Sequence, residues 1–232
     1  MQEKPPVITI DGPGGSGKGT IGQKLAWKFK WEFLDSGALY RLVGLSALNK
    51  QVDLSDVVML TGLARDLDAQ FAVRDSSNGE EWIILLEDWD VTEMLRTEDC
   101  AAAASKVAQY VPVREALLQR QRDFRVMPGL IADGRDMGTV VFPDAQLKIF
   151  LTASAEIRAE RRYKQLKGKG ISANLSAILA DIQARDYRDI NRAVSPLVPA
   201  EDAIIVDTSS MSVDEVEANI LKLAKNKFRE LI

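Results

Sequence analysis

A glycine-rich segment near the N-terminus has the composition and spacing of a loop that holds phosphate groups: Gly12, Pro13, Gly14, Gly15, Ser16, Gly17, Lys18, Gly19 and Thr20. Glycines let backbone N–H groups turn inward around a phosphate chain without clashes from Cβ atoms. A helix that begins near Gly17 adds the positive end of its dipole, and Lys18 supplies a mobile charge for the β- and γ-phosphates of a nucleotide. The segment therefore predicts a phosphate-binding P-loop.

Residue 19 departs from the strict G-x-x-x-x-G-K-[ST] pattern, because it is glycine and the hydroxyl comes one residue later, at Thr20. A side chain at position 19 therefore cannot bind Mg²⁺ directly. We expect phosphate oxygens and water to hold the Mg²⁺ ion, without a protein metal site.

A second interpretation fits the same glycines. Gly12, Gly14 and Gly17 match the G-x-G-x-x-G fingerprint of a dinucleotide site, with Asp35 as the acid that binds ribose. This interpretation gives no role to Lys18, so we favour the phosphate loop. The lysine also argues against a tight turn without a ligand.

Polar residues follow the strand-like run that ends at Asp35, where open α/β sheets bind their ligands. Asp35 could orient water on Mg²⁺, Ser36 could donate to a phosphate, and Arg41 lies about one helical turn further on. The plainer interpretation of Asp35 and Ser36 is a helix cap, which is compatible with ligand binding.

A second apolar run, 130–133, leads into Asp133-Gly134-Arg135-Asp136. The planar fork of Arg135 suits a phosphate, and Asp136 can accept a hydrogen bond from an exocyclic amine. The alternative is an Asp–Arg surface turn, which the surrounding glycines disfavour.

Basic residues recur in the last third of the sequence. Arg158 and Arg162 belong to a basic run that is either a solvated helix face or a mobile lid over phosphates, with Gly168 and Gly170 as a hinge. A separate stripe of arginines shares one face of the next helix and predicts an anion there: Arg185, Arg188 and Arg192.

The amino-acid composition excludes several kinds of active site. The 232 residues contain no histidine, which excludes Ser-His-Asp triads, Cys-His dyads and histidine metal sites. Cys100 is the only cysteine, so we expect no internal disulfide and a cytoplasmic location.

The charge balance bears on the partners of the protein. Lys and Arg number 30 against 34 Asp and Glu, which argues against a nucleic-acid partner. No apolar run is long enough to span a membrane, and without a heptad stripe we expect a monomer.

Strand-like and amphipathic segments alternate along most of the sequence. Buried strands are expected at 7–10, 130–133 and 147–151, and further strands at 31–35 and 203–207. Helices are expected at 17–29, 36–49 with Ser36 as N-cap, 99–110, 112–124, 155–166, 175–190 and 213–228. This alternation predicts an α/β fold: a P-loop core on a doubly wound parallel sheet.

The alternation is interrupted between residues 65 and 95. Strand-like runs at 67–73, 82–87 and 89–91, with a turn at Ser76-Ser77-Asn78-Gly79, predict a small antiparallel β insert. We expect a core of residues 1–64 and 96–232, an insert at 65–95 that helps to bind the acceptor, and a short helical lid at about 155–170.

Taken together, these motifs resemble those of the bacterial cytidylate kinases. The resemblance runs from about Val7 to beyond Asp207 and is carried by the segments 8–20, 34–41, 131–143 and 185–192. It implies ATP- and Mg²⁺-dependent phosphorylation of CMP and dCMP to the diphosphates, for pyrimidine nucleotide supply.

The resemblance also implies roles for individual residues. The ATP phosphates would be bound by the loop from Gly12 to Thr20 and by Arg158 and Arg162. The CMP phosphate would be held by Ser36, Arg41, Arg135 and Arg192; cytosine would contact Ser105, Arg114 and Asp136; the sugar would contact Arg185 and Asp189. The residues expected to act in catalysis are Lys18, Asp35, Arg135 and Arg192.

Three alternatives stay open on the sequence alone. The acceptor could be another small molecule such as UMP. The protein could be an NAD-dependent oxidoreductase, if the glycines serve a dinucleotide. It could also be a nucleotide switch that binds tightly without acceptor-dependent turnover.

Overall fold

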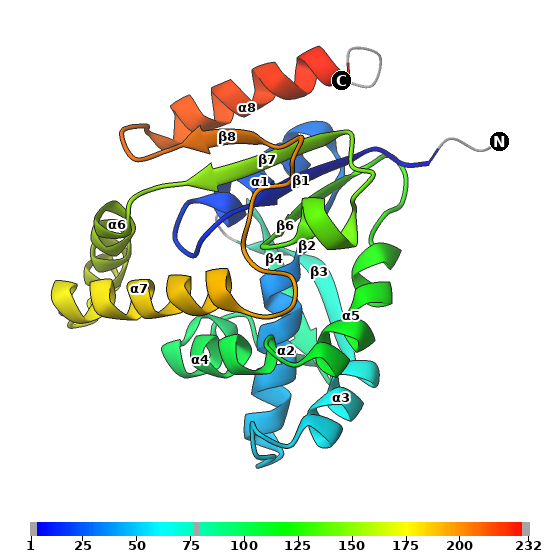
Figure 1. Cartoon of the computed structure of the whole chain (residues 1–232), viewed down its shortest axis with the longest axis vertical. Helices are drawn as coiled ribbons and strands as arrows, with labels where there is room; N and C mark the ends of the chain where they lie inside the picture. Colours follow the sequence, from blue (N-terminus) through cyan, green and yellow to red (C-terminus); the bar gives the residue numbers. More distant parts are fainter. Residues whose placement is uncertain (1–3, 77–78, 229–232) are drawn as a thin grey trace. The chain divides into compact units, whose positions relative to one another are not determined.

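The chain folds into two compact units in the computed structural model, which describes residues 4–76 and 79–228. The first unit is formed by the chain up to Asp35 and from Gln121 onward, and the second by Ser36–Arg120. Helices and strands of both units are labelled in Figure 1. No helix of the described segments is long and apolar enough to cross a bilayer.

The first unit is built on a five-stranded sheet in the order β2-β6-β1-β7-β8, in which every neighbouring pair is parallel. The strands are β1 (Val7–Asp11), β2 (Glu32–Asp35), β6 (Leu130–Gly134), β7 (Leu147–Thr152) and β8 (Ile204–Asp207). The chain leaves β1 toward β2 on one side and later reaches β7 and β8 on the other, so β1 lies where the connections reverse direction. Ligands of open α/β sheets bind at this point.

The strand register brings acidic residues to one edge of this sheet. Asp11 pairs with Gly134 across β1 and β6, and Asp35 pairs with Asp133 across β2 and β6. β1 is buried along its whole length, as expected of a central strand covered on both faces. The carboxyl edge of the sheet is therefore the place where the predicted loop and acids meet.

Helices complete the first unit. They are α1 (Lys18–Phe29), α6 (Ala155–Gly168), α7 (Leu175–Asn191) and α8 (Val213–Lys227), with a π-helical turn η2 (Met137–Val141) after β6. α1 packs on β6 and α8, while α6 packs along α7 (Figure 1). The predicted parallel sheet with flanking helices is confirmed.

The second unit combines helices with a small antiparallel sheet of order β3-β4-β5. Its elements are α2 (Ser36–Asn49), α3 (Val57–Arg65), β3 (Ala69–Ser76), β4 (Gly79–Leu86), β5 (Trp89–Asp90), the 3₁₀ turn η1 (Met94–Arg96), α4 (Glu98–Val107) and the start of α5 (Val111–Asp123). The predicted antiparallel strands are confirmed. The insert boundaries 65 and 95 stay a prediction, as does the lid.

Several local expectations differ from the structure. Helix α2 includes Ser36 as its first residue, so Ser36 is not the cap that precedes the helix. Helix α3 was not expected, because its first residues Val57 and Val58 are β-branched and hide the helical period. The π-helical turn was also not expected. Ser77 and Asn78 of the predicted hairpin turn lie outside the described residues.

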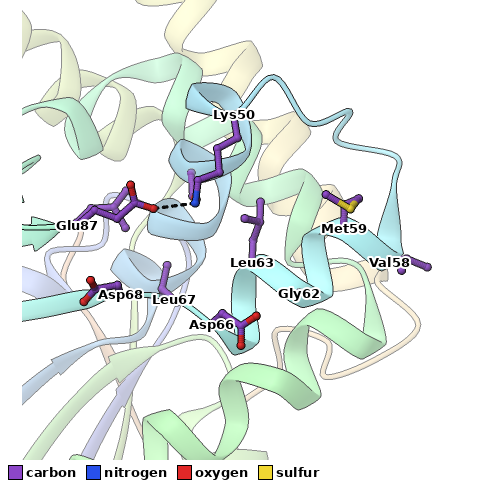
Figure 2. A pocket seen from close by; sticks show the side chains of 11 residues that line it. Lys50, Val58, Met59, Gly62, Leu63, Asp66, Leu67, Asp68 and Glu87 are labelled. Carbon is purple, nitrogen blue, oxygen red and sulfur yellow. Dashed lines mark hydrogen bonds and ion pairs between the residues drawn. The ribbon is translucent and has the colours of Figure 1, made fainter.

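A hollow of about 300 Å³ lies in the second unit, between the end of α2, α3 and the β4–β5 turn, and Figure 2 shows the side chains that line it. Lys50 Nζ and Glu87 Oε1 lie 2.7 Å apart at its side. None of the predicted site residues lines this hollow.

Candidate active site

The glycine-rich segment forms a loop between β1 and α1 whose backbone conformation requires glycine. Gly12 has φ of 146°, and a Cβ there would overlap the carbonyl oxygen of Leu151 in β7. Gly17, with φ of 95°, precedes the first residue of α1. Ser16 Oγ donates to the Pro13 carbonyl at 3.0 Å and closes the loop on itself. The predicted loop geometry, with a helix N-terminus at its end, is therefore present.

Lys18 is buried with only 5% of its surface exposed. Its Nζ donates to the Pro13 carbonyl at 2.9 Å and lies 3.9 Å from Asp133 Oδ1. Burial lowers the pKa of Lys18, and the nearby positive charge of Arg135 lowers it further. The negative charge of Asp133 acts in the opposite direction and raises the pKa of Lys18. Burial in turn raises the pKa of Asp133. A further anion at the loop would therefore stabilise the lysine charge.

Asp11 anchors the segment that follows β6. Its carboxylate accepts hydrogen bonds from the backbone N–H groups of Met137 at 2.9 Å and of Gly138 at 2.8 Å. Burial raises the pKa of Asp11 to about 6, although both hydrogen bonds act in the opposite direction. Asp11 thus ties the strand before the phosphate loop to the π-helical turn next to Arg135 and Asp136.

Asp11 and Asp133 were not among the predicted site residues. The sequence signal for Asp133 is its position near the end of a buried strand; the structure adds that it pairs in register with Asp35. No group of three or more acidic, histidine or cysteine side chains in the described ranges could hold a metal. Asp35 and Asp133, whose Cα atoms are partners in the strand register, do offer carboxylate oxygen atoms, the donor type that Mg²⁺ prefers, and they fit an ion that is held mainly by phosphate and water.

Three of the predicted arginines reach the same two glycines of the loop. A Cβ on Gly14 would lie 3.5 Å from Arg135 Nη2 and 3.8 Å from Arg185 Nη1. A Cβ on Gly15 would lie 3.3 Å from Arg158 Cβ. The three side chains come from the segment after β6, from α7 and from α6. The fold therefore gathers positive charge around the phosphate loop from distant parts of the sequence.

Each of three site arginines lies near a carboxylate. Arg135 Nε donates to Asp189 Oδ2 at 2.9 Å, Arg158 Nη2 donates to Asp186 Oδ2 at 2.5 Å, and Arg192 Nη2 lies 3.8 Å from Asp136 Oδ1. Burial alone would raise the pKa of Asp189, but the charge of Arg135 and two further arginines holds it below the usual range. The carboxylates therefore limit the repulsion within this arginine cluster.

The basic residues of α6 differ in their surroundings. Arg158 is buried, whereas Arg162 is half-buried. Arg161 donates from Nη2 to the Thr208 carbonyl at 2.6 Å, after strand β8. The helix is continuous to Gly168. Its first turns are thus fixed by arginines, and both expected hinge glycines lie at its far end.

Three further predicted residues, on α7 and at the start of α1, differ in how far they are exposed to solvent. On α7, Arg188 is exposed, so the predicted arginine stripe is only partly turned toward the site. Gly19 is half-buried and Thr20 is exposed on the first turn of α1. Nothing in their surroundings alters the conclusion that a side chain at position 19 cannot bind a metal.

Four predicted residues belong to the second unit. Arg41 Nη1 donates to the Leu95 carbonyl at 2.7 Å. Arg114 is buried and its guanidinium carbon lies 5.4 Å from the centre of the Tyr40 ring. Ser36 begins α2, and Ser105 is half-buried on α4.

The parallel sheet, the glycine-rich loop after its central strand and the buried lysine define a nucleotide-binding protein of the P-loop class. A model of the family "Cytidylate kinase" matches residues 8–226. The chain belongs to the cytidylate kinase family.

Curated relatives agree over the full length. The sequence is 55% identical to the cytidylate kinase of Aeromonas salmonicida, over 98% of this chain and 97% of that protein. It is 54% identical to the cytidylate kinase of Aeromonas hydrophila, over 100% of this chain and 99% of that protein. It is 53% identical to that of Shewanella baltica, over 99% of both. The resemblance seen in the motifs is therefore confirmed.

Proposed function

We propose that the protein transfers the γ-phosphoryl group of ATP to CMP and dCMP, giving CDP or dCDP and ADP. The observation that carries this proposal is the meeting of Arg135, Arg158 and Arg185 at Gly14 and Gly15, next to the buried Lys18. Phosphoryl transfer requires positioning and charge neutralisation more than covalent chemistry by side chains. The names of the curated relatives support CMP as acceptor. We further propose that the enzyme is cytoplasmic and acts as a monomer.

In the proposed mechanism, a phosphate oxygen of CMP attacks the γ-phosphorus in line with the leaving ADP. The monophosphate dianion is already a competent nucleophile, so the site needs no general base. This suits a chain without histidine. Lys18 and the arginines neutralise the charge that develops on the transferred group.

The phosphate loop from Gly12 to Thr20, with Arg158 and Arg162, binds the ATP phosphates in this proposal. Asp35 and Asp133 would hold and orient the water ligands of Mg²⁺, which when bound would supply positive charge beside the phosphates.

The acceptor contacts are proposed from the family motifs. Ser36, Arg41, Arg135 and Arg192 hold the CMP phosphate, and Arg185 and Asp189 contact the sugar. Ser105, Arg114 and Asp136 read cytosine. Asp136, which is 3% exposed, accepts a hydrogen bond from the N4 amine. Uracil has an acceptor at this position, so a buried carboxylate disfavours UMP.

The decisive experiment is a coupled assay of ADP release from Mg-ATP with CMP, dCMP, UMP and AMP as acceptors. Turnover with CMP well above that with UMP and AMP is the expected result. A preference for another acceptor would contradict the proposed cytosine contacts and leave the phosphate loop intact. Binding of ATP without any acceptor-dependent turnover would overturn the kinase proposal in favour of a nucleotide switch.

A further inference from the structure

Asp186 on α7 is not among the residues proposed to bind ATP or CMP, but it makes a bidentate ion pair with Arg158 inside the candidate site. Its Oδ2 accepts from Arg158 Nη2 at 2.5 Å, and its Oδ1 accepts from Arg158 Nη1 at 3.0 Å. The Arg158 side chain is 5% exposed and the Asp186 side chain 18% exposed. Such a pair is shielded from solvent and has a defined orientation.

Two backbone carbonyl groups complete the surroundings of Arg158. Its Nε donates to Ala153 at 2.9 Å, and Nη1 also donates to Gly14 in the phosphate loop at 3.0 Å. Together with the two bonds to Asp186, four of the five N–H groups of the guanidinium are used. The plane of the guanidinium is therefore fixed against the loop.

We propose that Asp186 is a positioning residue for phosphoryl transfer, which acts by holding Arg158 against the phosphate loop. The inference rests on the proposed kinase function and extends it to a residue that has no substrate contact of its own. The two carbonyl groups are neutral, so Asp186 is the ion-pair partner that the structure gives to Arg158. Without that carboxylate, a buried guanidinium gains by turning toward water or toward another acid.

The opposite role would give the opposite result. If Asp186 instead competed with ATP phosphates for Arg158, its removal would tighten ATP binding. If Asp186 positions Arg158, removal of its charge lowers kcat/KM for ATP, because misplacement of a reacting group by ~1 Å can cost about 10²-fold in rate.

The test is the substitution Asp186→Asn, which keeps the size of the side chain and removes its charge. The matched control is Asp181→Asn on the exposed side of the same helix. With ATP varied at saturating CMP, we expect kcat/KM for ATP to fall roughly 10- to 100-fold in Asp186→Asn, while KM for CMP changes less than about twofold and Asp181→Asn behaves like wild type. A lower KM for ATP, or a KM for CMP that rises as much as the KM for ATP, would overturn the proposal.

A double-mutant cycle with Arg158→Gln separates positioning from a general loss of folding. If Asp186 acts through Arg158, adding Asp186→Asn to Arg158→Gln changes kcat/KM for ATP by less than about twofold. A further large loss would contradict the proposal. This comparison uses only Arg158→Gln and the double variant, so it does not require a stable Asp186→Asn single variant. The double variant has no unpaired charge at this pair.

The kinase function and the positioning role can fail separately. If wild type shows no turnover with CMP, the proposed function fails. Titration of wild type and Asp186→Asn with ATP still tests the positioning role. A weaker affinity for ATP in the variant than in wild type supports the role, and an equal or higher affinity overturns it.

Discussion

At the scale of single residues, Lys18 is the side chain on which the proposed chemistry depends most directly. It is buried among arginines, and the nearest carboxylate oxygen lies 3.9 Å away. We expect Lys18→Ala to lower kcat by at least about 10³-fold, since the charge on the transferred phosphoryl group loses its mobile partner.

Steady-state assays and circular dichroism check this prediction together. The control is Lys28→Ala, an exposed lysine on the same helix, which should keep near-normal turnover. A Lys18→Ala protein that is folded and retains a near-normal rate would show that the lysine has no catalytic part.

Tyr40 and Arg114 allow a second prediction about selectivity. Because the ring lies below the guanidinium at 5.4 Å, it helps to orient the side chain proposed to read cytosine. We expect Tyr40→Leu to raise KM for CMP about fivefold and to reduce the preference for CMP over UMP, whereas Tyr40→Phe retains both. An unchanged CMP to UMP ratio in the leucine variant would contradict this role.

Asp11 gives a prediction about stability and pH. Its pKa of about 6 in the folded state lies above the value of 3.8 in the unfolded chain, so the unfolded state binds fewer protons between these pH values. Ionised Asp11 therefore costs stability, and this cost grows as the pH rises from 3.8 to about 6. Asp11→Asn removes the titration, although it also weakens the hydrogen bonds to the π-helical turn.

The measurement is urea unfolding of wild type and Asp11→Asn across that pH range. The unfolding free energy of the variant, relative to wild type, should rise by about 3 kcal/mol toward higher pH. A difference that stays constant with pH would mean that Asp11 has an ordinary pKa in the folded protein.

At the scale of secondary structure elements, helix α8 has a complete capping box at its start. Ser212 Oγ accepts from Glu215 N at 3.3 Å, and Glu215 Oε2 accepts from Ser212 N at 2.8 Å. Ser212→Ala should lower the unfolding free energy by about 1 kcal/mol and leave kcat unchanged, because the ion pairs that join α8 to α1 involve Lys24 and Lys28, which have no proposed role in the site. Chemical denaturation with a parallel activity assay tests this, and an unchanged unfolding free energy would exclude a stabilising cap.

The elements themselves were largely predictable from the sequence. The strands β1, β6 and β7 are short runs of mostly buried residues, and such runs stand out between amphipathic helices. The π-helical turn over Met137–Val141 could not be predicted, because Thr139, Val140 and Val141 are β-branched residues that favour strands. Tertiary bonds from Asp11 to its first residues override that preference.

The site was predictable to a different degree. The phosphate loop and the arginines carry recognisable residue types, so motifs in the sequence predict them, and their roles stay predictions. The pairing of Arg158 with Asp186 depends on how α6 packs on α7, and a one-dimensional pattern holds no information about such a contact. The same is true of Asp133, whose meaning comes from the register of β6 with β2.

At the scale of the whole molecule, the proposed substrate contacts are divided between the two units. All residues proposed to bind ATP lie in the first unit, whereas Arg41 lies in the second. We therefore expect Arg41→Ala to raise KM for CMP about tenfold and to leave the affinity for ATP within about twofold of wild type. Titration calorimetry with ATP and steady-state kinetics with CMP measure the two effects, and a loss of ATP affinity in a folded variant would contradict the division.

The order of the strands also sets the order in which the protein can assemble during synthesis. β1 pairs with β6 and β7, whose residues begin only at Leu130 and Leu147, so a ribosome releases the phosphate loop long before the neighbours of its strand exist. The second unit is continuous in sequence from Ser36 to Arg120 and can complete its contacts while the rest is still being translated. We therefore expect the ability to bind a nucleotide to arise late in synthesis, once β6 and β7 are available to pair with β1.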